Sequence, residues 1–172
     1  METDSPTETV TPAAVDQAAG GLREYLEATP LQLSPALSQE AGCRVHLKIE
    51  SIQPTRSFKV RGALNKLLRM TPEQRSAGLI TASAGNHGLG VAHAARAFDV
   101  PARVHVPEGA NRLKVEAIRR LGGLVIEGGG SYQEAFREAE RARAGIGATL
   151  VHAYDDPEVI AGQGTIAVEI LR

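Results

Sequence analysis

The sequence predicts an α/β protein built on a doubly wound parallel sheet, with helices on both faces in three layers. From residue 57 onward, short apolar runs of strand length alternate with longer stretches of helical periodicity. Gly and Pro separate successive units, as at Val100-Pro101 and Gly122-Gly123. Glycine and alanine contribute 18 and 26 of the 172 residues, a composition that suits close packing of helices on a sheet.

The repeating region begins at Ser57, which can cap a helix that ends near Met70-Thr71-Pro72. The strands expected after it are Leu79–Ala82, Arg103–Val106, Leu124–Ile126 and Thr149–His152. The helices expected with them are His87–Phe98, Asn111–Leu121, Ser131–Ala144 and Pro157–Leu171. Because strand, helix and strand follow one another at this spacing, we expect right-handed crossovers between parallel strands. Ligands of such sheets bind at the carboxyl ends of the strands.

Four segments precede this region. Residues 1–12 are polar and acidic, and they predict a disordered leader. We then expect a helix over Ala13–Glu27 and a short helix over Pro35–Ala41, with Ser34 as its cap. Apolar and polar residues alternate over Val45–Glu50, which predicts a strand.

Composition and charge exclude several classes of protein. Nineteen basic and twenty acidic residues give a net charge of −1, which is not the footprint of a nucleic-acid-binding protein. No apolar run approaches the roughly 20 residues needed to span a bilayer, so no membrane partner is expected. The single Cys43 excludes an internal disulfide framework and a multi-cysteine zinc site. The acidic start does not resemble a signal or transit peptide, so we expect a cytoplasmic protein.

Lysine is scarce in this chain, which limits the candidates for amine chemistry. The lysines are Lys48, Lys59, Lys66 and Lys114. Lys59 falls in the first turn of an expected helix, where the helix dipole disfavours a cation. We expect Phe58 and Arg61 also to lower the pKa of this amine, as a Schiff-base lysine requires. A surface lysine at a helix start is the alternative.

A second candidate site is the segment Thr81–Gly88, between an expected strand and helix. Its small residues leave backbone N–H groups exposed at a helix N-terminus, which favours an anion such as phosphate or carboxylate. Asn86 adds a donor and an acceptor. The order of Gly85, Gly88 and Gly90 does not match G-x-G-x-x-G, which excludes a Rossmann nucleotide site. An ordinary capped loop is the alternative.

Two other patterns predict no ligand site. Gly128–Gly130 is similar to a phosphate cradle, but Ser131 can cap the next helix, which favours a plain turn. No group of His, Asp and Glu residues has metal-ligand spacing, so we expect no metal site. His87 is the one histidine within a candidate site loop.

Five segments of the chain occur in an order typical of one known family. They are Thr29-Pro30-Leu31, Val45–Glu50, Ser57–Ala63, Ala82–His87 and Asp155–Thr165. Together they resemble the fold-type-II pyridoxal-phosphate enzymes, and in particular the threonine/serine dehydratase branch. The resemblance implies a tryptophan-synthase-β-like fold, pyridoxal 5'-phosphate as cofactor, an amino acid as small-molecule substrate, and a homodimer.

The resemblance also implies a role for each candidate residue. Lys59 would bind the cofactor as a Schiff base and later act as the base at the substrate's α-carbon. Phe58 would pack near the cofactor ring, and Asn86 would hydrogen-bond the ring hydroxyl oxygen. The substrate carboxylate would be held by the loop of Ser83, Ala84, Gly85, Asn86 and His87. The reaction would be β-elimination from L-threonine or L-serine, which yields a 2-keto acid and ammonia.

Two positions distinguish this chain within the family. Similar racemases carry a serine where this chain has Ala84, so the resemblance implies dehydration and not racemisation. The family usually has a glycine just before the Ser-Phe-Lys run, where this chain has Arg56, and the sequence leaves the effect of this bulky cation on the loop open.

The resemblance further implies two domains. Residues 13–60 and 153–172 would belong to a larger domain, and residues 61–152 would form a complete smaller one. The family's glycine-rich phosphate loop, the partner of the pyridine nitrogen and any cation site would lie beyond residue 172, so we expect a truncated chain. Two alternatives to an active enzyme therefore stay open: a catalytically incompetent fragment and a non-catalytic amino-acid-binding module.

Overall fold

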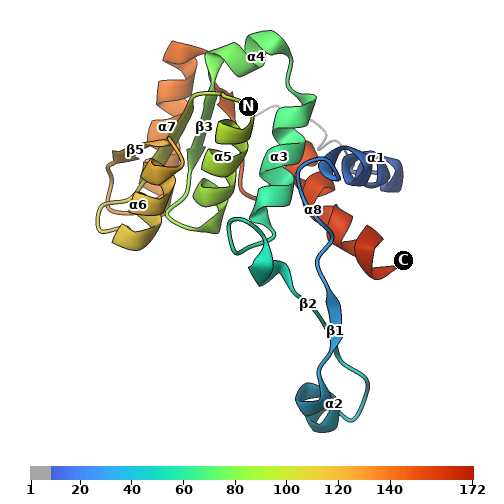
Figure 1. Ribbon diagram of the computed structural model, residues 1–172. Coiled ribbons are helices and arrows are strands. Elements are labelled where there is room, and N and C mark those ends of the chain that lie inside the picture. Colours follow the sequence, from blue (N-terminus) through green and yellow to red (C-terminus); the bar gives the residue numbers. More distant parts are fainter. Residues whose placement is uncertain (1–8) are drawn as a thin grey trace.

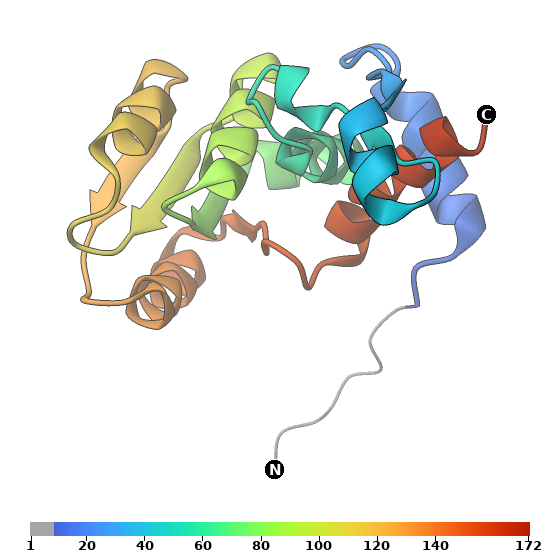
Figure 2. The same cartoon turned by 90° about the horizontal axis from the view of Figure 1, so that it is seen from below.

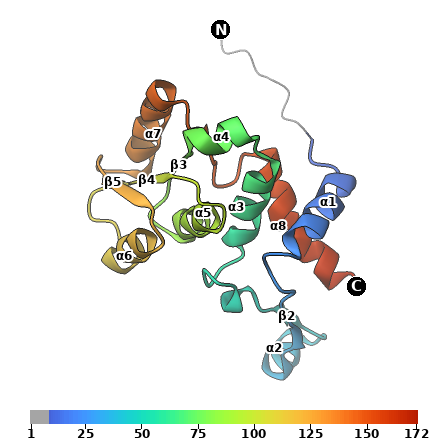
Figure 3. The ribbon, with the colours of Figure 1, turned by 45° about the horizontal axis from the view of Figure 1, so that its top comes forward.

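The computed structural model describes residues 9–172 and contains a four-stranded parallel sheet (Figure 1). From one edge to the other, its strands are β5 (Leu124–Glu127), β4 (Ala102–Val106), β3 (Leu79–Ala82) and β6 (Thr149–Leu150). The helices beside it are α5 (Asn86–Ala97) and α6 (Arg112–Arg120) on one face, and α7 (Tyr132–Ile146) on the other (Figure 3). The predicted α/β class and three-layer parallel sheet are confirmed.

The sheet reverses its winding direction between β3 and β6. From β3 the chain proceeds outward to β4 and then to β5, whereas β6 returns to the opposite side of β3. Loops that leave β3 and β6 therefore diverge to opposite sides, and such a switch point is where open α/β sheets bind ligands.

Alternation of side chains along the central strands produces two apolar layers. Ile80 and Ala82 of β3 pack with Ala139 of α7. Val104 and Val106 of β4 point the other way and form the layer beneath α5 and α6. Strand β3 is buried along its whole length, and its one polar side chain, Thr81, donates its hydroxyl to the carbonyl of Val151 at 2.8 Å.

Beside the sheet, three helices form a second body: α1 (Pro12–Leu22), α3 (Lys59–Arg69) and α8 (Pro157–Ile170). Figure 2 shows α8 lying between α1 and α3, and α3 also packs on α5. Two glycines allow the helices to cross closely. A Cβ at Gly162 would lie 2.6 Å from the carbonyl oxygen of Arg61, and one at Gly62 would lie 2.7 Å from that of Val159.

The N-terminal part forms an arm that projects from this body (Figure 1). Its elements are β1 (Leu31–Leu33), α2 (Pro35–Ala41), β2 (His46–Lys48) and the 3₁₀ helix η1 (Glu50–Ile52). Strands β1 and β2 pair antiparallel, and Ser34 caps α2 as predicted. Within residues 9–172, no helix combines the length and apolar character needed to cross a membrane.

The structure corrects several predicted boundaries. Helix α1 begins at Pro12, capped by Thr11, so the predicted leader of residues 1–12 overlaps it; residues 1–8 lie outside the described part of the chain. It ends at Leu22 and not at Glu27. Strand β1 was not expected, and the predicted strand over Val45–Glu50 is shorter.

A further helix, α4 (Pro72–Ala77), follows the place where the chain was expected only to turn. Thr71 and Gln74 form a reciprocal capping box around its first turn. Pro72 therefore begins a helix here, because its missing N–H is at a position that needs no intrahelical partner.

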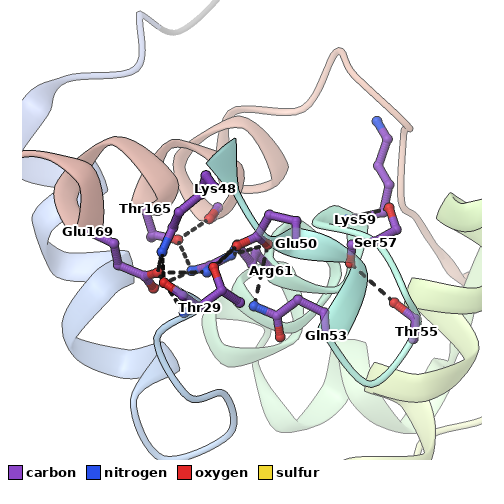
Figure 4. A network of polar contacts seen from close by, with 11 residues as sticks. Thr29, Lys48, Glu50, Gln53, Thr55, Ser57, Lys59, Arg61, Thr165 and Glu169 are labelled. Carbon is purple, nitrogen blue, oxygen red and sulfur yellow. Dashed lines mark hydrogen bonds and ion pairs between the residues drawn. The ribbon is translucent and has the colours of Figure 1, made fainter. Parts of the chain in front are cut away.

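A network of polar contacts centred on Arg61 joins the arm to the helical body (Figure 4). The guanidinium is 1% exposed, and all five of its N–H donors have acceptors. Glu50 accepts from Nε and Nη2 at 2.8 Å each, and Glu169 accepts from Nη1 at 2.7 Å and Nη2 at 3.0 Å. Thr165 accepts from Nη1 at 3.1 Å. Helix α3 is thereby tied to η1 and α8.

Two further groups complete the network. Lys48 of β2 donates to Glu169 and to the backbone carbonyl of Thr29. The Thr29 hydroxyl donates to Glu50 at 2.6 Å. Burial by itself would raise the pKa values of Glu50 and Glu169, but hydrogen bonds and charge from Arg61 outweigh it and hold both below the ordinary value. Both carboxylates are therefore ionised at neutral pH.

Replacing Arg61 with methionine should strongly destabilise the protein. The change leaves two partly buried carboxylates without their main partner, and we expect the free energy of unfolding to fall by about 3–5 kcal/mol. Urea unfolding measures this change. The control is Arg120→Met, which breaks an exposed pair with Glu116 and should cost no more than about 0.5 kcal/mol. Equal effects of the two changes would contradict the central place of Arg61.

The network also predicts a loss of stability in acid. Because the folded-state pKa values of Glu50 and Glu169 are depressed, the stability that they contribute is present above the ordinary value of 4.5. It is lost as the pH falls from 4.5 toward the folded-state values. We expect the wild-type free energy of unfolding to decrease with pH in this window, and to decrease less steeply in a Glu50→Gln/Glu169→Gln variant. Parallel pH profiles from urea unfolding would show that other carboxylates govern acid stability.

Candidate functional site

Lys59 is the first residue of α3 and extends toward the segment after β6. Its backbone N–H donates to the Ser57 hydroxyl at 3.3 Å, which holds the first turn of the helix. Its Nζ donates to the backbone carbonyl of Ala153 at 2.7 Å and lies 5.2 Å from the ring centroid of Phe58. Lys59 makes no ion pair within residues 9–172. The amine is therefore held by one neutral acceptor.

Burial lowers the pKa of the Lys59 amine below its ordinary value. The direction agrees with the prediction, but the expected contribution of Arg61 is wrong. Arg61 points to the opposite side of α3, where Glu50 and Glu169 neutralise its charge (Figure 4). Desolvation alone thus favours the neutral amine, the form that can act as nucleophile or base.

The loop after β3 leads directly into α5. The Ser83 hydroxyl is buried and accepts from the Gly85 N–H at 3.2 Å, and Ala84 packs beside the layer under α6. Nothing lies within 4 Å of a Cβ built at Gly85. A Cβ at Gly88 would lie 2.7 Å from the carbonyl oxygen of Ser83, so only glycine allows this tight approach of helix and loop.

Helix α5 begins without a capping side chain. Six other α-helices begin with a capping side chain, and these caps are Thr11, Ser34, Thr71, Asn111, Ser131 and Asp156. The first backbone N–H groups of α5 are therefore left for an external acceptor, and the space at Gly85 is open. This arrangement suits an anion.

His87 is buried in the first turn of α5, with 3% of its surface exposed. Its Nε2 lies 3.0 Å from the carbonyl oxygen of Val151, and since a carbonyl only accepts, Nε2 carries the proton. Burial lowers the pKa of His87 to about 4, with smaller contributions from Lys59 and His152. The ring is therefore neutral at neutral pH, and its Nδ1 has no partner in the described part of the chain.

Asn86, the first residue of α5, is exposed and contacts a residue not expected at the site. Its Oδ1 accepts a hydrogen bond from Nζ of Lys114, in the first turn of α6. The sequence did not identify Lys114 as a site residue, because no motif near it in the chain suggests a ligand. A lysine in the first turn of a helix that follows a parallel strand is the one signal that could have identified it.

Backbone packing brings the two predicted segments to the same edge of the sheet. A Cβ at Gly90 would lie 3.1 Å from the backbone carbonyl of Lys59, so α5 contacts the first turn of α3 directly. Lys59 and His87 then reach neighbouring carbonyls of the segment after β6, those of Ala153 and Val151. Both segments therefore lie at the switch point between β3 and β6.

The remaining sequence features take no part in this arrangement. Gly128–Gly130 forms a turn that ends in a Ser131 cap, as predicted. His152 lies just past β6, where its Nδ1 accepts from the backbone N–H of Asp155 at 2.8 Å. Over the described residues, no group of three His, Cys, Asp or Glu side chains is placed to hold a metal ion.

Comparison with known proteins assigns the chain to a family. The family model of the pyridoxal-phosphate dependent enzymes matches residues 22–172. The chain belongs to this family.

Members of the family with curated functions are similar to nearly the whole chain. The L-threonine ammonia-lyase of Thermotoga maritima is 42% identical over 158 residues, which are 92% of this chain and 39% of the relative. The biosynthetic L-threonine dehydratase of Mycobacterium leprae is 46% identical over 169 residues, which are 96% of this chain and 40% of the relative. The chain spans about 40% of the length of these relatives.

A solved structure of the family supports the fold. Serine racemase from Dictyostelium discoideum superposes with a TM-score of 0.87 at 32% identity, over 94% of this chain and 53% of that protein. The fold is therefore that of the fold-type-II enzymes.

The residues at the switch point fit the family cofactor, pyridoxal phosphate. The cofactor needs an amine for its aldehyde, and Lys59 offers one whose pKa is lowered by burial and that makes no ion pair within residues 9–172. Its ring oxygen needs a donor, which the side-chain amide of Asn86 can supply, while the uncapped start of α5 is left for the carboxylate of an amino acid.

Arg56, the cation that stands before the Ser-Phe-Lys run, has a left-handed backbone with φ of 56°. Its N–H donates to the carbonyl of Gln53 at 2.7 Å and closes the turn that leads to Lys59. The turn therefore places Arg56 in a conformation that favours glycine, and its side chain is exposed.

Replacing Arg56 with glycine should stabilise the protein. The change relieves about 1–2 kcal/mol of left-handed strain, part of which is offset by the greater freedom of glycine in the unfolded chain. We expect a net gain of about 0.5–1 kcal/mol in urea unfolding. Arg44→Gly is the matched control, because Arg44 is an exposed loop arginine without a positive φ and should gain nothing. A loss of stability in Arg56→Gly would show that the side chain matters more than the backbone.

Proposed function

We propose that the chain carries the cofactor lysine and the carboxylate-binding loop of a pyridoxal-phosphate dependent ammonia-lyase for L-threonine or L-serine. The observation that carries the proposal is the placement of Lys59. Its desolvated amine, without an ion pair among residues 9–172, lies at the switch point beside the uncapped N-terminus of α5. The similarity to threonine ammonia-lyases supports the substrate class.

In this proposal Lys59 has two tasks. Its Nζ holds the cofactor and then accepts the proton that leaves the α-carbon of the substrate. Both tasks need the neutral amine, whose fraction rises because burial lowers its pKa. When bound, pyridoxal phosphate supplies the electron sink that makes this α-proton acidic.

The loop after β3 orients the substrate. Backbone N–H groups at the start of α5 donate to the substrate carboxylate, and the Ser83 hydroxyl fixes the loop by accepting from the N–H of Gly85. Neutral His87 adds no charge and ties α5 to the segment after β6 through the carbonyl of Val151. Asn86 donates to the ring oxygen of the cofactor, and half-exposed Phe58 flanks its ring.

Ala84 favours elimination over racemisation. Racemisation needs a second acid on the face of the α-carbon opposite Lys59, and a methyl group at position 84 can neither give nor take a proton. Elimination needs proton movement only on the Lys59 face, followed by departure of the β-hydroxyl. Elimination releases water and an enamine, and after tautomerisation to the imine one water hydrolyses it to a 2-keto acid and ammonia.

Reductive labelling tests the assignment of Lys59. We expect incubation with pyridoxal phosphate and then borohydride to label Lys59, as mapped by mass spectrometry, and Lys59→Ala to abolish this label. Lys66→Ala is the matched control, since Lys66 is another α3 lysine but pairs with Asp156 at 2.8 Å. Labelling spread over all four lysines would overturn the assignment. A Lys59 label without 2-keto acid from threonine or serine would restrict the 172 residues to cofactor binding.

A further inference from the structure

Lys114 is held beside the candidate site by the packing of α6. Val115 and Ile118 are buried against α5 and β4, which fixes the rotation of α6. Asn111 caps the helix and accepts from the backbone N–H of Lys114 at 3.3 Å. The side chain of Lys114 is thus directed to the first residue of α5, where its Nζ donates to Oδ1 of Asn86.

Local stability does not explain a cation at this position. Lys114 lies in the first turn of α6 and contacts the first residue of α5, and the positive ends of both helix dipoles oppose a cation there. No carboxylate of residues 9–172 pairs with it. Its side-chain hydrogen bond within these residues is the one to Asn86. A locally unfavourable charge beside a candidate site points to a functional reason.

We infer that Lys114 is a positioning residue that fixes the orientation of the Asn86 side-chain amide. An amide presents an acceptor at one end and two donors at the other. Since the ammonium of Lys114 can only donate, it selects the orientation in which Oδ1 faces α6 and Nδ2 is free to donate elsewhere. The charge-assisted bond also polarises the amide and makes Nδ2 a stronger donor.

This inference rests on the proposed function, in which Asn86 donates to an anionic ring oxygen of the cofactor. Without Lys114 the exposed amide could rotate and offer its oxygen to that anion, which would repel it. Lys114 therefore acts through Asn86 and does not need to contact the cofactor.

The first test reads the Asn86 amide directly and needs no cofactor. The chain has three asparagines, Asn65, Asn86 and Asn111, so selective ¹⁵N labelling gives three resolvable side-chain amides in NMR spectra. We expect Lys114→Met to shift the Asn86 side-chain resonances and leave those of Asn65, which donates to Glu158, in place. Lys114→Arg should preserve the wild-type resonances, because arginine retains the donor. Arg112→Ala, which removes a charge from the same turn, should not shift them.

The second test measures the cofactor. We expect Lys114→Met to require about tenfold more pyridoxal phosphate for half-maximal borohydride labelling of Lys59, and to change the visible absorption of the bound cofactor. Lys114→Arg should restore both readouts, and Arg112→Ala should match the wild type.

The outcomes separate the two proposals. No labelling of Lys59 in the wild type, with the NMR shifts as expected, overturns the proposed function but supports the contact. Wild-type labelling with unchanged NMR and absorption spectra in Lys114→Met overturns the inference. Equal effects of Arg112→Ala and Lys114→Met also overturn it, because net charge and not a specific hydrogen bond would then be responsible.

Discussion

The rest of the structure depends on the burial of Arg61 between two carboxylates. Residues two apart on an α-helix project about 200° apart around its axis. Since all five donors of Arg61 are committed to the side of α3 that faces Glu50, Glu169 and Thr165, Lys59 must project from the other side. That side faces β6 and α5. An ion network that never touches the candidate site thus sets the direction of the amine within it.

The second constraint is the sheet topology. The winding reverses between β3 and β6, and the N-termini of α3, α5 and α6 lie at the same edge of the sheet. Aligned helix N-termini create positive potential without the large solvation of free cations. Desolvation then acts on Lys59 in the same direction, toward the neutral amine. The protein thereby combines positive potential from helix N-termini with an amine whose pKa is lowered, two properties that a cluster of exposed lysines could not provide together.

Elements were predictable where local chemistry decides them. The strand Leu79–Ala82 is a short apolar run bounded by breakers, and the helix Pro35–Ala41 has both a cap and a stop, so each has the predicted bounds. Strand β1 was not expected because three residues are too few to show a periodic pattern. Its pairing with β2 depends on tertiary structure and not on the local sequence. Helix α4 was not expected because a proline can either end a helix or begin one. At Pro72 the capping box of Thr71 and Gln74 is the sign that a new helix begins.

Lys59 and Asn86 could be located from the sequence as residues at expected helix starts, while their roles came from the family resemblance and stay predictions. The partners of the lysines could not be located, because they come from distant segments. Lys48 pairs with Glu169 and Lys66 with Asp156, so both charges are neutralised in the body of the protein. In the part of the chain that the structure describes, Lys59 and Lys114 are the lysines left without a carboxylate, and both lie at the carboxyl edge of the sheet. Each of the four lysines is therefore either paired with a carboxylate or held by a neutral acceptor, Ala153 for Lys59 and Asn86 for Lys114.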